Sequence, residues 1–254
     1  MRKYLALLAT VIVIGVNAAA NILPINGVNT GEISARYPTG FTPAGWVFAI
    51  WSLIYLGLIA FGLFATRVPP EKSARVRGIE PAYIVSCVAN AAWIFMWHYG
   101  YIAASFALMT VLLGSLLVVY ARLRSTAPAS TAERVCVDMP FSLYFGWITT
   151  AILANLAAWF YDLRLYPFNL PMDDWAILTV VTATAIYTAV GVRTRDAIYT
   201  GVFAWASLGI VLQTLETSHA VRLAAAAGCA VMLVVTSVSL VRGGVSGVGD
   251  SKRR

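Results

Sequence analysis

The chain alternates between long apolar blocks and short polar segments. The apolar blocks are roughly 17–22 residues long, which is the length at which an α-helix crosses a hydrocarbon core about 30 Å thick. This pattern predicts eight transmembrane helices, at residues 4–22, 45–66, 80–98, 102–121, 138–160, 174–192, 197–215 and 220–241. The expected fold class is therefore an all-α polytopic membrane protein.

Proline and acidic residues punctuate these blocks. Glu80-Pro81 and Asp138-Met139-Pro140 are expected to open the third and fifth helices, because proline is tolerated in a first turn and the helix dipole favours acidic groups there. The outer loop 23–44 is expected to cover the outer mouth of the bundle. The inner loop 122–137 has the composition of a plain solvated linker.

Composition excludes an ordinary water-soluble domain. Of the 254 residues, 60% are hydrophobic and only 11% are charged, whereas a soluble domain has about 25% charged residues. The first apolar block, which follows Arg2-Lys3 and ends near Ala18-Ala19-Ala20, has two interpretations: a retained helix or a cleaved signal peptide.

The basic residues lie mostly on one side of the predicted helices. If the N-terminus is inside, only Arg36, Arg164 and Arg222 of the 18 Lys and Arg residues fall in outer segments. This asymmetry follows the positive-inside rule, so both termini are expected in the cytoplasm and the bacterial inner (plasma) membrane is the expected location. Because the basic residues are spread over separate segments, the net charge of +7 predicts contact with lipid headgroups and no nucleic-acid partner.

Charged side chains avoid the middle of the predicted helices, where they would mark an ion or proton path. The groups nearest to the helices lie at their ends: Glu80, Asp138, Asp174, Glu216 and Arg222. We therefore expect no catalytic residue and no metal site, and an enzyme is not the favoured class. His98, at an outer helix end, has two interpretations: an axial haem ligand, or a hydrogen bond to a headgroup or the backbone.

Tryptophan and asparagine supply the remaining candidate chemistry. Asn90 and Trp93 are spaced i, i+3, and therefore share a helix face. Trp147, Ala151 and Asn155 form a second stripe at i, i+4, i+8. The amides have two interpretations: hydrogen bonds between helices, or part of a pocket for a rigid polycyclic ligand.

The other tryptophans divide by depth. Trp51 joins Trp93 and Trp147 as a deep residue. Four lie at predicted outer helix ends and are expected to form an interfacial aromatic belt: Trp46, Trp97, Trp159 and Trp175.

Three segments together resemble one known family. The stretch Phe41-Thr42-Pro43-Ala44-Gly45-Trp46-Val47-Phe48-Ala49-Ile50-Trp51-Ser52-Leu53-Ile54-Tyr55 resembles the W-x-P-P-x-W-x-F-x-x-x-W-x-x-x-Y signature of the TspO/MBR family, the tryptophan-rich sensory proteins related to the mitochondrial translocator protein. The Asn90-x-x-Trp93 and Trp147-x3-Ala151-x3-Asn155 motifs resemble that family's third and fifth helices.

The resemblance covers roughly residues 1–162 and implies a TspO-like five-helix bundle there. Residues 163–242 would then be a three-helix C-terminal extension, and residues 243–254 a disordered basic tail, so the chain resembles a divergent, longer branch. Leu156-x4-Tyr161-x2-Arg164 also fits a cholesterol consensus, in the region where the translocator protein has its own.

The resemblance implies a hydrophobic small-molecule ligand such as a porphyrin or another tetrapyrrole, with haem as a candidate bound cofactor. It also implies a homodimer embedded in membrane lipids. Three functions stay open: a sensor or carrier, a transporter that uses the extra helices, and a photochemical enzyme that degrades its porphyrin. The predicted ligand-binding residues are Phe41, Pro43, Trp46, Trp51, Tyr55, Asn90, Trp93, Trp147, Ala151 and Asn155.

Overall fold

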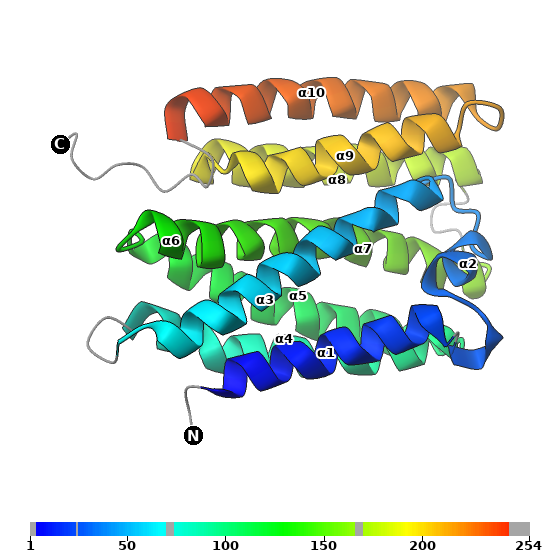
Figure 1. The fold of residues 1–254 in the computed structure, drawn as a ribbon. Coiled ribbons are helices and arrows are strands. Elements are labelled where there is room, and N and C mark those ends of the chain that lie inside the picture. The colour runs from blue at the N-terminus through cyan, green and yellow to red at the C-terminus, as the bar shows by residue number, and fades with distance from the viewer. Residues whose placement is uncertain (1–3, 24, 70–73, 166–169, 244–254) are drawn as a thin grey trace.

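The computed structural model describes residues 4–23, 25–69, 74–165 and 170–243, and all regular elements in these ranges are helical (Figure 1). The long helices are α1 (Leu5–Ile22), α3 (Ile50–Arg67), α4 (Ala74–His98), α5 (Ile102–Ser125), α7 (Met139–Asp162), α8 (Met172–Thr194), α9 (Ala197–Gln213) and α10 (His219–Gly243). The short ones are the 3-10 helices η2 (Ile25–Gly27) and η3 (Gly45–Ala49), helices α2 (Thr30–Ala35) and α6 (Thr131–Glu133), and the π-helix η5 (Arg134–Asp138).

A long helix lies at each of the eight predicted positions. Six helical stretches are long and apolar enough to cross a membrane: Gly45–Arg67, Ala74–His98, Ile102–Ser125, Thr131–Asp162, Met172–Thr194 and His219–Arg242. The remaining two, Leu5–Ala20 and Ala197–Gln213, are apolar but shorter. The predicted class, an all-α polytopic membrane protein, is confirmed. The predicted tail from residue 244 onward lies outside the described residues.

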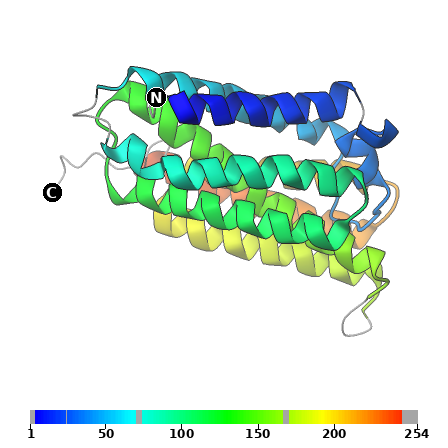
Figure 2. The same cartoon turned by 90° about the horizontal axis from the view of Figure 1, so that it is seen from below.

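Five helices form a closed ring. Helix α1 packs against α3 and α4, α4 against α5, α5 against α7, and α7 against α3. Figure 2 shows α4 and α5 side by side along their whole length. Helices α8, α9 and α10 form a separate layer, joined to the ring mainly by α9 against α7 (Figure 1).

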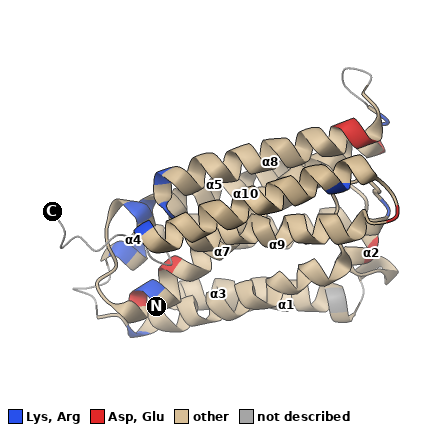
Figure 3. Ribbon diagram, turned by 90° about the horizontal axis from the view of Figure 1, so that it is seen from above, with Lys and Arg blue, Asp and Glu red and all other residues tan. Residues whose placement is uncertain are grey.

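The two ends of the bundle differ in charge. Helix α1 begins and α10 ends at the same end of the molecule (Figure 1). Lys and Arg residues gather at that end, whereas Asp and Glu residues lie at both ends (Figure 3). The arrangement matches the positive-inside pattern of the sequence, and the two ends are called inner and outer below.

Helix α4 does not begin at Pro81, as the sequence predicts, but at Ala74, and Pro81 lies inside it. The preceding turn is held by tertiary contacts. Arg75 forms ion pairs with Glu133 at 2.7 Å and Asp138 at 2.6 Å, and also donates to the carbonyl oxygen of Leu123. These bonds stabilise the first turns of α4, although Pro81 has no backbone N–H and one hydrogen bond of the helix is therefore missing.

The inner loop 122–137 is not the solvated linker that its composition predicts. Most of it is helical, and the side chain of Glu133 is buried against Arg75. Composition alone misses this because a buried carboxylate is tolerated only when its partner is close, and Arg75 is remote in sequence.

The three-helix layer holds the segment that leads into α3. The backbone amide of Ala44 donates to the carbonyl oxygen of Gly209 at 3.2 Å, and the indole of Trp205 donates to that of Val47 at 3.0 Å. A Cβ atom on Gly209 would collide with Val47, so glycine permits this close approach of α9. Helix α9, which lies outside the ring, therefore holds the segment at the start of α3 in place.

A buried carboxylate ties the layer to the ring at the inner end. Asp196 is fully buried and forms an ion pair with Arg124 of α5. Its side chain also accepts from Tyr120 at 2.9 Å and Ser142 at 2.7 Å, and it caps α9 by accepting from the amide of Ile198 at 3.1 Å. One side chain thus joins α5, α7 and α9.

We expect Asp196→Ala to lower the free energy of unfolding by about 3–5 kcal/mol, because it leaves the Arg124 guanidinium without its buried partner. Titration of the purified protein with SDS in mixed micelles measures the change. The control is Asp174→Ala, which removes an exposed carboxylate and is expected to change little. Equal effects of the two substitutions would contradict the assigned role of Asp196.

Candidate functional site

A small central cavity lies in the outer half of the five-helix ring. Its volume is about 50 Å³, and it is lined by α3, α4 and α7 with α2 and the segment before α3. The lining consists of Thr30, Ser34, Tyr37, Thr42, Pro43, Phe48, Trp51, Trp93, Trp97, Trp147, Thr150, Ala151, Ala154, Asn155 and Ala158. Four of these side chains are indoles and, among the described residues, no charged one lines the cavity, so this is an apolar aromatic site.

A larger lateral hollow adjoins it between α1, α3 and α4. Figure 1 shows α1 and α3 diverging toward the outer end, and a hollow of about 590 Å³ lies between them. Trp51, Tyr55 and Trp93 line it together with Asn17 of α1. Trp51 and Trp93 line the central cavity as well, so these two indoles form part of the wall that the two spaces share.

A third hollow, here called the vestibule, lies at the outer mouth and has a volume of about 300 Å³. One side comes from α2 and the segment between α2 and α3, and the other from the start of α8, the end of α9 and the turn before α10. Phe48 lines the vestibule, the central cavity and the lateral hollow, and its ring meets Trp147 edge-on at 5.9 Å. The three spaces therefore meet at one aromatic side chain.

The structure brings most of the predicted ligand-binding residues together. Six line the central cavity, namely Pro43, Trp51, Trp93, Trp147, Ala151 and Asn155, and Tyr55 lines the lateral hollow. Phe41, Trp46 and Asn90 line neither space. Phe41 is fully buried in the core, and Trp46 is 40% exposed and packs on Trp205.

Asn90 joins helices. Its side-chain oxygen accepts from Asn17 of α1 at 2.7 Å, and its side-chain nitrogen donates to the hydroxyl of Tyr144 of α7 at 2.9 Å. Asn155 lines the cavity but is also paired, because it exchanges hydrogen bonds with Ser105 of α5 at 3.1–3.2 Å. The inter-helix interpretation therefore describes the contacts of both amides.

Two indole N–H groups at the cavity have no hydrogen-bond partner among the described residues. They belong to Trp93 and Trp147, which are 6% and 3% exposed. By contrast, the N–H of Trp97 points to the carbonyl oxygen of Thr30 at 3.4 Å. A buried donor without an acceptor costs about 1–3 kcal/mol, so these two positions stand out chemically.

The prediction that Trp97 belongs to an interfacial belt is wrong. Trp97 is 5% exposed and stacks on Trp93, with ring centroids 6.0 Å apart. It lies under α2, which shields the outer end of α4. Trp97 is spaced i, i+4 from Trp93 and therefore shares its helix face, so the sequence does contain a signal for Trp97 as a cavity residue. The spacing i, i+3 from Trp147 gives the same signal for Thr150.

Helix α2 is fixed over the cavity by a cap and a histidine. Asn29 and Glu32 form a reciprocal capping box at its start. His98 is buried, with Nδ1 3.0 Å from the carbonyl oxygen of Ile25 and Nε2 3.0 Å from the hydroxyl of Thr30. Both ring nitrogens are engaged, so the backbone-bonding interpretation of His98 holds and neither nitrogen is open to a haem iron.

The lining of the central cavity is neutral. Burial raises the pKa of the Tyr37 phenol, the negative charge of Asp162 acts in the same direction, and Arg36 opposes it. Tyr37 therefore stays protonated and able to donate a hydrogen bond at neutral pH. Within the described residues no cluster of three His, Cys, Asp or Glu could hold a metal ion.

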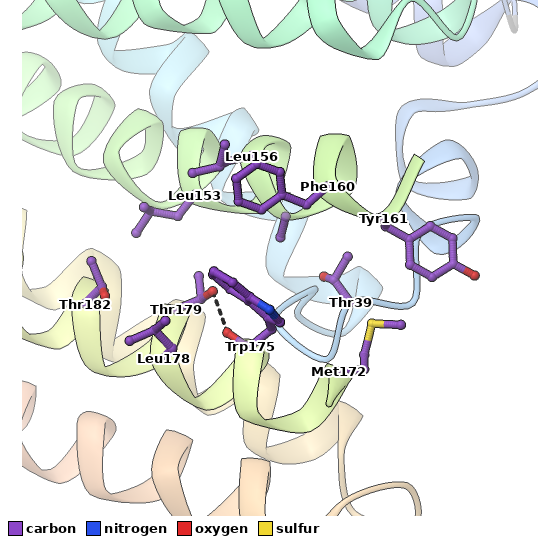
Figure 4. A pocket seen from close by; sticks show the side chains of 11 residues that line it. Thr39, Leu153, Leu156, Phe160, Tyr161, Met172, Trp175, Leu178, Thr179 and Thr182 are labelled. Carbon is purple, nitrogen blue, oxygen red and sulfur yellow. Dashed lines mark hydrogen bonds between the residues drawn. The ribbon is translucent and has the colours of Figure 1, made fainter. Parts of the chain in front are cut away.

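A separate crevice of about 140 Å³ lies between α7 and α8 (Figure 4). Phe160 and Trp175 form its aromatic walls, and Leu156 and Tyr161 of the cholesterol consensus also line it. Arg164, the third consensus residue, does not line it. The crevice shares no lining residue with the central cavity.

We expect His98→Ala to release helix α2, because it removes both side-chain contacts to the segment 25–30. Amide hydrogen exchange should become faster at residues 25–37 and stay unchanged in the middle of α4. His219→Ala, at an exposed histidine in another outer turn, is the control. Unchanged exchange at residues 25–37 in His98→Ala would show that His98 does not hold helix α2 in place.

We expect Asn90→Leu to destabilise the protein by about 1–3 kcal/mol through loss of its two buried hydrogen bonds. Because Asn90 lines neither cavity, the affinity for any ligand that binds there should change less than twofold. Unfolding by SDS and ligand titration of the same preparation measure the two quantities. A large loss of affinity with unchanged stability would instead place Asn90 in the ligand site.

Comparison with known proteins adds the family. The family model for "TSPO-like protein" matches residues 3–238, which include seven of the long helices and most of α10 and extend well beyond the residues that carry the sequence motifs. Searches of curated proteins and of solved structures found no match. With a match over nearly its whole length, the chain belongs to the family of TSPO-like proteins, and it is an integral multi-pass membrane protein of that type.

Proposed function

We propose that this protein binds a flat, apolar, polycyclic ligand in the outer half of its five-helix ring and acts as a sensor or carrier of that ligand. The observation that carries the proposal is the pair of unpartnered indole N–H groups, of Trp93 and Trp147, at one aromatic cavity. A tetrapyrrole, which offers a planar apolar body and several nitrogen and oxygen acceptors, fits this chemistry.

The energetics favour a ligand that supplies acceptors. Each unpartnered donor costs about 1–3 kcal/mol in the empty protein, and hydrocarbon cannot satisfy it. A ligand atom that accepts from Trp93 or Trp147 would recover that cost on binding. The stacked pair of Trp93 and Trp97 offers a flat face against which a polycyclic ring can pack.

The volumes of the two spaces indicate that a polycyclic ligand would occupy both of them. The central cavity of about 50 Å³ holds only a small group, whereas the lateral hollow of about 590 Å³ lies in the usual range of about 300–1,000 Å³ for ligand pockets. In the proposed complex the body occupies the lateral hollow and its acceptor edge reaches the central cavity. Rotation of Phe48, which borders both, would join the two.

The contacts in the inner half of the bundle favour binding of the ligand over its transport through the protein. There the ion pairs of Arg75 with Glu133 and Asp138 link α4 to α6 and η5, and the ion pair of Arg124 with Asp196 links α5 to the start of α9. Breaking buried pairs of this kind costs several kcal/mol each. A ligand that arrives from the outer side therefore meets a closed inner end.

We expect Trp93→Phe and Trp147→Phe each to raise the dissociation constant for protoporphyrin about 2- to 10-fold, because phenylalanine keeps the ring contact but cannot donate a hydrogen bond. Titration of the porphyrin absorbance band with purified protein measures the affinity. Trp159→Phe is the matched control, since Trp159 lines neither cavity. Unchanged affinity in both site variants, or no binding to the wild type, would refute the proposal.

A further inference from the structure

The vestibule is built differently from the two spaces behind it. Its lining from the three-helix layer is mostly polar, with Gln213, Thr214, Thr217 and Ser218 from the outer end of α9 and the turn before α10. Among the described residues, Asp173, in the first turn of α8, is the only charged one that lines the vestibule, the central cavity or the lateral hollow. The lining of the route to the indoles, as far as the structure describes it, therefore carries one negative charge and no positive one.

No basic residue in the described part of the chain pairs with this carboxylate. Among the described residues Asp173 forms no ion pair, and its side chain accepts a hydrogen bond from the hydroxyl of Ser218 at 2.7 Å. Arg36, Arg164 and Arg222 are the basic residues of the outer end, and none lines the three spaces. Arg222 is already engaged, since it donates to the carbonyl oxygen of Leu215 at 2.8 Å.

The vestibule is continuous with the proposed ligand site. Phe48 lines all three spaces, and Gly31 and Gly45 line both the vestibule and the lateral hollow. A ligand whose body lies in the lateral hollow can therefore place a substituent in the vestibule. The unpartnered donors of Trp93 and Trp147 would contact the body of the ligand, and Asp173 would contact a substituent that extends from that body into the vestibule.

We infer that the vestibule is a subsite for a cationic substituent, so that the ligand is an amphiphile with a flat apolar body and a positively charged arm. The inference rests on the proposed function and narrows its ligand class. The carboxylate of Asp173 would attract an ammonium group and repel a carboxylate, while Gln213 and the neighbouring hydroxyl groups accept or donate further hydrogen bonds. A dicarboxylic porphyrin is then a poorer ligand than its cationic derivative.

Three protoporphyrin derivatives with the same macrocycle test the inference: the free dicarboxylate, the neutral dimethyl ester, and the diamide with ethylenediamine, which carries two ammonium groups. We expect the cationic derivative to bind about two- to fivefold more tightly than the ester, as for an exposed ion pair, and the dicarboxylate to bind more weakly than the ester. Because the site is exposed, these differences should shrink at high salt.

Asp173→Asn should remove the advantage of the cationic derivative and leave the affinity of the ester unchanged. Asp174→Asn is the matched control, because the neighbouring carboxylate lies in the same helical turn and lines none of the three spaces. It should keep the preference, which separates a contact with Asp173 from the general field of the outer end.

The outcomes separate this inference from the proposed function. Binding of the ester without charge preference in the wild type, or a preference that survives in Asp173→Asn, would overturn the cationic subsite and leave the apolar site standing. Failure of all three derivatives to bind would refute the proposed function, and the subsite with it.

Discussion

Hydrocarbon offers no hydrogen-bond partner, so a helical membrane protein has to pair its buried polar groups internally. This chain does so between its helices: Thr10 of α1 meets Tyr83 of α4 at 2.6 Å, Asn90 bonds to both α1 and α7, and Thr150 of α7 meets Tyr187 of α8 at 2.8 Å. Against that background the two unpartnered indole N–H groups are exceptions, and both lie at the same cavity. The packing of the bundle and the proposed ligand site thus follow from one constraint.

The same constraint explains how charge is distributed. Buried ions are placed at the inner end, where Arg75 and Arg124 have carboxylate partners close by, and the central cavity is left neutral. The C-terminal layer contributes at both ends of the ring. Asp196 anchors it at the inner end, and Gly209 and Trp205 hold the segment before α3 at the outer end. The cavity wall that contains Phe48 is therefore supported by helices outside the ring.

Hydrophobic patterning predicts the helices well because each must cover the same thickness of hydrocarbon. The sequence also predicts that Trp51, Trp93, Trp147 and Asn155 converge, since their motifs place them on defined helix faces. It does not predict the depth of Trp97, because helix α2 covers that position from outside α4. Nor does the sequence predict that Asn90 lies outside the cavity lining, because the contacts of Asn90 with α1 and α7 depend on how each helix is rotated about its own axis. The role of Glu133 is missed for the same reason, since its partner Arg75 is remote in sequence.

The central claim is that Trp93 and Trp147 donate hydrogen bonds to a ligand, and their indole N–H resonances report this directly. Protein labelled with ¹⁵N-tryptophan in lipid nanodiscs would be titrated with the dimethyl ester of protoporphyrin, and the resonances assigned by single Trp→Phe substitution. The account predicts that the indole protons of Trp93 and Trp147 move downfield on binding, as hydrogen bonds form, while that of Trp159 stays in place. Saturable binding with the Trp93 and Trp147 resonances unmoved would contradict it.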